Sequence, residues 1–159
     1  MNLKFKNIVL FVKDIDMSRK FYTDILEQKI ENQFGRIIYF KSGISIWELS
    51  ENLPIVQELG GRLKKTVTNQ VELYFESDNL DKVLFRMREH VVRLLHEVRE
   101  EPWGQRTIRF YDPDDHLIEV GETLKTFITR YHKQGYIPEQ IAEKTSVDIE
   151  LIKKIIRIK

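Results

Sequence analysis

The chain has 159 residues, of which 42% are hydrophobic and 32% charged, and this balance fits one globular domain with at most a small appendage. Its net charge of +1 gives no overall attraction to nucleic acid or acidic membranes. The absence of cysteine excludes disulfides, thiolate ligands and a cysteine nucleophile, and no apolar run has transmembrane or signal-peptide length, so we expect a cytoplasmic protein.

The first third of the chain has the pattern of one strand, one helix and three strands. Early acidic residues from Asp14 onward suit a helix N-terminus, and apolar residues continue at helical spacing to Leu26. The turn residues Phe34-Gly35 and Ser42-Gly43 separate three strand-like segments. We expect strands at 5–12, 28–33, 36–41 and 44–49, and a connection at 51–69 with a short helix at 54–59.

The same βαβββ order then repeats, which is the signature of a duplicated unit. Val71–Glu76 alternates strictly, and Asp78-Asn79 caps the next helix. Asp112-Pro113-Asp114-Asp115 is a turn between two strands. We expect a helix at 79–90 and strands at 71–76, 91–98, 105–111 and 117–120.

Two glutamates lie inside apolar strands and are therefore candidate site residues. Glu119 is the only charge in Leu117–Val120, and a carboxylate there needs a partner, a metal or a proton. Glu72 alternates with Leu73, which we expect to pack under a helix, so Glu72 should point to the other face of the sheet.

Two stretches resemble the vicinal oxygen chelate superfamily, which includes glyoxalase I, bleomycin-resistance proteins and extradiol dioxygenases. They are WGQRTIRFYDPDDHLIEV, similar to its closing hairpin, and IVLFVKDIDMSRKFYTDIL, similar to its first strand and helix. Over residues 4–122 the resemblance implies an α+β fold. The resemblance also implies that two βαβββ modules, 1–50 and 70–122, form an open curved sheet around a cavity. Asp115 stands where the family usually has Gly, which often supplies a positive φ, and Asp is among the next most tolerant residues.

In the glyoxalase-like members each module supplies one metal ligand from its first strand and one from its last. Carried over by motif, these positions are Asn7, Glu48, Glu72 and Glu119, and the family's two histidines are replaced by Asn7 and Glu72. All-oxygen ligation favours Mg²⁺, Mn²⁺ or Ca²⁺, whereas the resemblance implies Ni²⁺ or Zn²⁺. Alternatively, the guanidinium of Arg36, Arg106 or Arg109, and not a metal ion, compensates the charge of the clustered carboxylates.

Two functions follow from the resemblance. The first is a divalent-metal-dependent lyase or isomerase acting on a small α-oxygenated carbonyl compound, with Glu119 or Glu48 taking the proton and the metal acting as Lewis acid. The alternative is a metal-free small-molecule binder of the bleomycin-resistance type, which would take an aromatic or cationic ligand. Tyr74, Trp103 and Arg106 are the expected ligand-binding residues, and we expect a homodimer.

Residues 123–159 extend beyond the usual family domain and have a helical pattern. We expect a helical extension with one helix at 123–134, a short helix that begins at Pro138, and a third helix at 148–158. The stretch GYIPEQIAEKTSVDIELIKKII is similar to a helix-turn-helix. The last segment is dominated by isoleucine, whereas a DNA-reading helix presents polar and cationic side chains. A packing role, or docking on a dimer mate, is therefore favoured over nucleic-acid binding.

Overall fold

The computed structural model describes residues 3–60 and 71–157, so the second half of the predicted connection lies outside the described residues. The chain divides into two compact units. Unit 1 comprises Met1–Val71 and Asp112–His116, and unit 2 comprises Glu72–Tyr111 and Leu117–Lys159. Within the described residues, no helix has the length and apolar character needed to cross a membrane.

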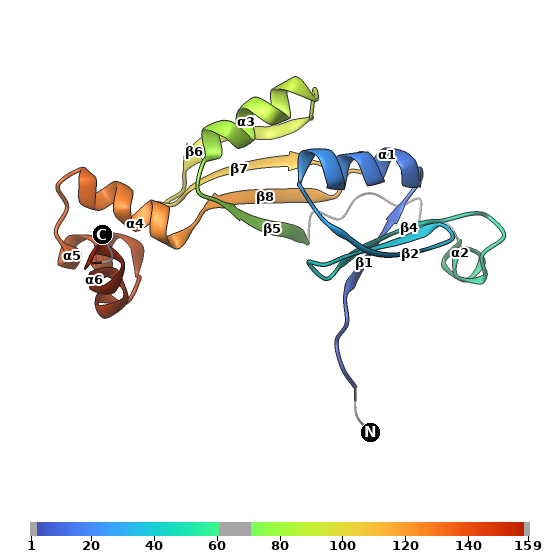
Figure 1. Ribbon diagram of the computed structural model, residues 1–159, viewed down its shortest axis with the longest axis horizontal. Coiled ribbons are helices and arrows are strands. Elements are labelled where there is room, and N and C mark those ends of the chain that lie inside the picture. Colours follow the sequence, from blue (N-terminus) through green and yellow to red (C-terminus); the bar gives the residue numbers. More distant parts are fainter. Residues whose placement is uncertain (1–2, 61–70, 158–159) are drawn as a thin grey trace. The chain divides into compact units, whose positions relative to one another are not determined.

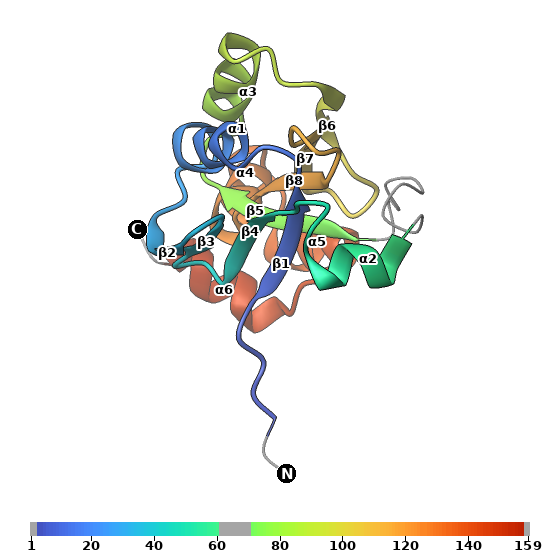
Figure 2. The same ribbon diagram turned by 90° about the vertical axis from the view of Figure 1, so that its right-hand side faces the viewer.

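Unit 1 contains a four-stranded sheet covered by one helical segment. The strand order is β1-β4-β3-β2, with β1 parallel to β4 and the other neighbours antiparallel, as the left-to-right sequence β2, β3, β4, β1 in Figure 2 shows. A short helix, α2, follows the sheet where the sequence predicts one. The elements are β1 (Ile8–Val12), α1 (Ile15–Lys20), a π-helical turn (Phe21–Ile25), β2 (Ile30–Phe34), β3 (Ile37–Phe40), β4 (Ile44–Glu48) and α2 (Pro54–Leu59).

The segment α1 begins at a side-chain cap and packs on one face of this sheet. Asp14 accepts hydrogen bonds from the backbone N–H groups of Asp16 and Met17, both at 2.9 Å, which satisfies two of the free N–H groups of the first turn. The ring of Tyr22, in the turn after α1, stacks on Phe40 with centroids 5.5 Å apart. Burial of these rings against Ile38 and Ile46 forms the core of unit 1.

Unit 2 repeats the topology of unit 1. Its sheet has the order β5-β8-β7-β6, again with the first pair parallel and the others antiparallel. Figure 1 shows α3 lying along one side of this sheet. The elements are β5 (Glu72–Ser77), α3 (Leu80–Glu89), β6 (Leu94–Glu100), β7 (Arg106–Tyr111) and β8 (Leu117–Glu122).

The turn between β7 and β8 is closed by Asp112. One carboxylate oxygen accepts from the N–H groups of Asp114 at 2.9 Å and His116 at 2.8 Å, and the other lies 2.8 Å from the His116 ring. Asp115 has φ of 70°, the positive φ that Gly often supplies at this position of the family motif. Tyr22 also donates to Asp112 at 3.0 Å, which explains why this turn belongs to unit 1.

Three C-terminal helices form a small core of their own. They are α4 (Leu124–Lys133), α5 (Pro138–Thr145) and α6 (Ile149–Arg157). The buried residues that hold them together are Phe127, Ile128, Tyr131, Ile141 and Ile152. Ile152, Ile155 and Ile156 of α6 therefore pack within the extension. Docking on a dimer mate stays a prediction.

The two predicted βαβββ modules are confirmed, but some strand boundaries were wrong. The first strand begins at Ile8 and not at Phe5. The strand predicted from Val91 begins at Leu94, because Val91 takes φ of 52° and Val92 donates back to Met87 at 2.9 Å, which ends α3 in a turn. β-Branched residues rarely adopt positive φ, so the sequence pattern gave no sign of this turn.

Candidate functional site

Strand alternation gives the unit 2 sheet two different faces. Leu73, Ile108 and Ile118 are buried on the face that carries α3. Arg109 lies opposite Glu119 in the β7–β8 register, and Tyr74 lies opposite Glu119 in the β5–β8 register. With Glu72, these residues point away from α3. We call this side, defined by Glu72, Tyr74, Arg109 and Glu119, the carboxylate face.

The guanidinium of Arg109 is the centre of the carboxylate face. Its Nε donates to Glu72 Oε2 at 3.1 Å, and its Nη1 donates to Glu101 Oε1 at 2.6 Å. Its Nη2 forms an ion pair with Glu119 Oε2. That oxygen has no hydrogen bond of ordinary geometry in the described chain, so Coulomb attraction is what compensates its burial. The partner that the carboxylate of Glu119 requires is thus Arg109.

Two of the carboxylates that contact Arg109 are buried, so their charges interact strongly with its guanidinium. Glu119 is 4% exposed and Glu101 is 8% exposed. Burial lowers the pKa of Arg109, but the hydrogen bonds that Arg109 donates to Glu101 and Glu72, and the charges of these carboxylates, outweigh it and raise that pKa above its ordinary value. Arg99 also pairs with Glu101 at 3.3 Å, so three carboxylates meet two guanidiniums and 3 − 2 leaves one net negative charge. The cluster therefore attracts cations weakly and repels anions.

Next to the cluster, two aromatic side chains are linked through one amide. Gln105 donates from Nε2 to the Tyr74 hydroxyl at 2.9 Å, and Trp103 donates from its indole N–H to Gln105 Oε1 at 3.2 Å. Tyr74 is 49% exposed and Trp103 is 45% exposed, so both rings offer free surface. Gly121 makes room for this arrangement, because a Cβ there would lie 2.7 Å from Gln105 Nε2 and 2.9 Å from the Tyr74 hydroxyl.

The predicted ligands of unit 1 are each held by neighbours in that unit. Asn7 donates its amide to the Ser45 hydroxyl. Glu48 forms an ion pair with Arg36 and accepts from the N–H of Ile15 at 2.7 Å, at the start of α1. Hydrogen bonds from Arg36 and Ile15 lower the pKa of Glu48, against a smaller opposing effect of burial.

Glu48 consequently lies on the face of β4 that carries α1. Trp47 lies on the other face, where its ring meets that of Phe11 with centroids 5.9 Å apart. Trp47 therefore does not pack under α1. Four consecutive apolar or small residues, Ile44–Trp47, made the two faces of β4 indistinguishable in the sequence.

Within each unit, protein groups already engage the predicted metal ligands. Arg109 contacts both Glu72 and Glu119, and a metal bridging these two carboxylates would meet the guanidinium charge at short range. Asn7 and Glu48 are likewise occupied by Ser45 and Arg36. Among the described residues, no three His, Asp or Glu side chains gather as a metal site. The assignment of these residues as ligands stays a prediction.

Arg106 lies on the opposite face of β7 from Arg109, where it donates to Glu122. Alternation along the strand separates these two arginines, which the sequence offered as equal candidates. Glu101 and Gln105 are site residues that the sequence analysis missed. Both come from the irregular segment between β6 and β7, where no periodic pattern indicates the direction of a side chain.

Comparisons with known proteins agree with this architecture. A family model described as a glyoxalase-like domain matches residues 5–125. The fosfomycin resistance protein FosX of Listeria monocytogenes is 27% identical over 135 residues, which cover 80% of this chain and 96% of that protein.

Two solved structures from Agrobacterium tumefaciens show the same likeness. One, a protein of unknown function, is 36% identical with a TM-score of 0.62, covering 78% of this chain and 97% of the other. The other, a lactoylglutathione lyase, is 20% identical with a TM-score of 0.54, covering 76% and 93%. The family match ends at the first residues of α4, so most of the helical extension lies beyond it. The chain belongs to the glyoxalase-like domain family of the vicinal oxygen chelate superfamily.

Proposed function

We propose that this protein is a metal-independent small-molecule-binding member of its family, and that it takes an aromatic cation on the carboxylate face. The observation that carries the proposal is the position of Arg109, whose guanidinium satisfies Glu72, Glu101 and Glu119 together. A protein with its own cation among these carboxylates has no electrostatic need for a metal.

The ligand class follows from the charge and the aromatic surface of the same face. The cluster keeps one net negative charge, and Glu76, which accepts from Tyr74 at 3.2 Å, adds another acidic group beside it. The exposed rings of Tyr74 and Trp103 supply stacking and cation–π surface. Glu72, with a side chain 37% exposed, is the carboxylate best placed to meet a ligand ammonium.

Calorimetry with two ligands of equal size and opposite charge tests this function. Phenethylamine should bind and phenylacetate should not, with or without a chelator. Glu72→Gln should weaken phenethylamine binding by about 1 kcal/mol, the usual value of one exposed ion pair. Equal binding of both ligands, or binding of the amine that a chelator abolishes, would reject the proposal. Light scattering in the same buffer tests the expected homodimer.

The runner-up function is the metal-dependent lyase or isomerase, and the position of Glu119 favours it. Glu119 occupies the last strand of module two, where the family motif places its metal-binding carboxylate. This function requires Arg109 to leave the carboxylates before a metal enters. Turnover of a hemithioacetal that depends on added Mn²⁺ or Ni²⁺ and is lost in Glu119→Gln would make it the better account.

A further inference from the structure

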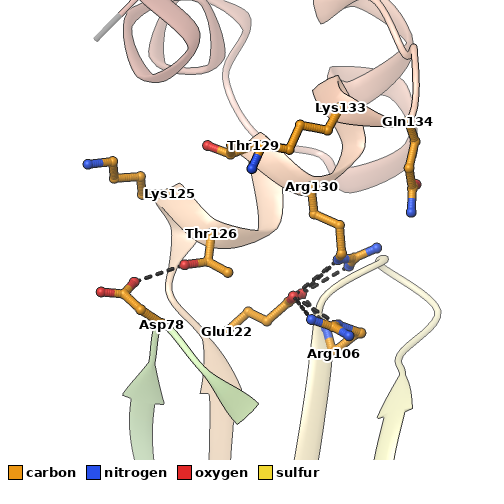
Figure 3. A pocket seen from close by; sticks show the side chains of 9 residues that line it. All are labelled: Asp78, Arg106, Glu122, Lys125, Thr126, Thr129, Arg130, Lys133 and Gln134. Carbon is orange, nitrogen blue, oxygen red and sulfur yellow. Dashed lines mark hydrogen bonds and ion pairs between the residues drawn. The ribbon is translucent and has the colours of Figure 1, made fainter. Parts of the chain in front are cut away.

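A second site lies on the other side of the unit 2 sheet, against the helical extension. It is a pocket of about 570 Å³, within the range typical of small-ligand sites. Figure 3 shows its wall formed by α4 and by the ends of β7 and β8. The lining residues are Asp78, Arg106, Glu122, Lys125, Thr126, Thr129, Arg130, Lys133 and Gln134.

This pocket is distinct from the carboxylate face. Arg106 and Glu122 have the strand parity of Ile108 and Val120, the buried residues on the α3 side, and not that of Arg109 and Glu119. Most of its wall comes from α4, which the family match barely reaches. The site is therefore a property of the extension.

The two acidic groups of the pocket are already satisfied by protein donors. Glu122, 1% exposed, accepts from Arg106 Nε at 2.9 Å and from Arg130 Nη2 at 2.9 Å, and Figure 3 shows both guanidiniums converging on it. Asp78 accepts from the Thr126 hydroxyl at 2.8 Å. Among the lining residues, four basic side chains against two carboxylates give a charge of 4 − 2 = +2. Glu100, outside the lining, also pairs with Arg130 at 3.1 Å.

Three further donors are arranged along one side of α4, and the charge of one of them, Lys125, also acts on Asp78. Lys125, Thr129 and Lys133 follow one another at intervals of four residues, so they share one face of the helix. Within the described chain, none of these three side chains takes part in an ion pair or hydrogen bond. Two mobile ammonium groups and a hydroxyl thus remain available to a ligand.

We propose that this pocket binds a small dianion through its phosphate or carboxylate oxygens. The charge of such a ligand is opposite to the +2 of the residues that line the pocket. The ammonium groups of Lys125 and Lys133 contact the ligand oxygens, and Thr129 donates a hydrogen bond between them. The guanidiniums of Arg106 and Arg130, fixed on Glu122, add a positive field beneath the ligand without moving.

Calorimetry on the full chain with inorganic phosphate and with succinate tests this proposal. At least one of these dianions should bind at a single saturable site, more tightly than acetate, and the tighter of the two identifies the preferred oxygen group. Lys125→Gln/Lys133→Gln should weaken that binding about tenfold, because each exposed ion contact contributes a few-fold. Both lysines are exposed, so the variant keeps the fold.

The matched control is Lys82→Gln/Lys154→Gln, which removes the same charge from exposed positions outside the pocket. It should leave the affinity unchanged. Glu119→Gln should also leave it unchanged, so this result is independent of the function proposed for the carboxylate face. Absence of saturable binding for both dianions, or equal weakening by the control pair, would overturn the proposal.

Discussion

Replacing Arg109 by leucine removes the cation that compensates the buried carboxylate of Glu119. Glu119 is 4% exposed, and removing one partner of a buried ion pair costs about 3–5 kcal/mol. Glu101 keeps Arg99 and Thr107 as partners, and the more exposed Glu72 loses at most about 1 kcal/mol. Since the Arg109 side chain is itself 15% exposed, we expect a value near the lower limit, about 3 kcal/mol.

Urea unfolding at neutral pH measures this loss. Arg99→Leu is the control, because the Arg99 side chain is 55% exposed and its contact with Glu101 should contribute less than about 1 kcal/mol. The double variant Arg109→Leu/Glu119→Leu should recover most of the stability, since a buried ion pair replaced by apolar side chains is often neutral. A loss below about 1 kcal/mol for Arg109→Leu would refute the argument that Glu119 depends on this cation.

Three further outcomes follow from the contacts of unit 2 and the β7–β8 turn. Glu122→Gln should release α4 from the sheet, seen as faster hydrogen exchange in α4 with α3 unchanged; equal exchange in both proteins would contradict this. Gly104→Ala should lower the free energy of unfolding by about 2 kcal/mol, because φ is 91° and the new Cβ would lie 2.6 Å from the Tyr131 hydroxyl; an unchanged urea midpoint would argue against it. Burial lowers the pKa of His116, but the hydrogen bond and charge of Asp112 outweigh it and raise that pKa. This stabilisation is complete below the unfolded pKa of about 6.5 and is lost as pH rises through the folded pKa, so His116→Asn should flatten the decline in stability above that pH.

The fold was predictable from the sequence because its signals are local and repeated. Alternation in Val71–Glu76 correctly separated Glu72 and Tyr74 from Leu73. Asp115, at the position where Gly often supplies a positive φ, has φ of 70°. Such features depend on a few neighbouring residues, and the repeated order of elements indicates that both sheets share one topology.

The candidate site was less predictable because its partners depend on register. Arg106 and Arg109 were equal candidates in the sequence. The choice between them rests on the five-residue turn Asp112–His116, which pairs Arg109 with Glu119. The direction of Glu48 depends on which face of β4 receives α1, and an apolar strand carries no signal for that. The contacts between side chains on neighbouring strands could therefore be identified only from the structure.

Metal content of the wild-type protein tests the central claim most directly. Tag-free protein, prepared without chelator and then incubated with Mn²⁺, Mg²⁺, Ni²⁺ or Zn²⁺, is desalted and analysed for bound metal beside Glu119→Gln. If Arg109 is the cation of the carboxylate face, neither protein retains a stoichiometric ion. About one ion per chain in the wild type, lost in Glu119→Gln, would contradict the account and place a metal where Arg109 now lies.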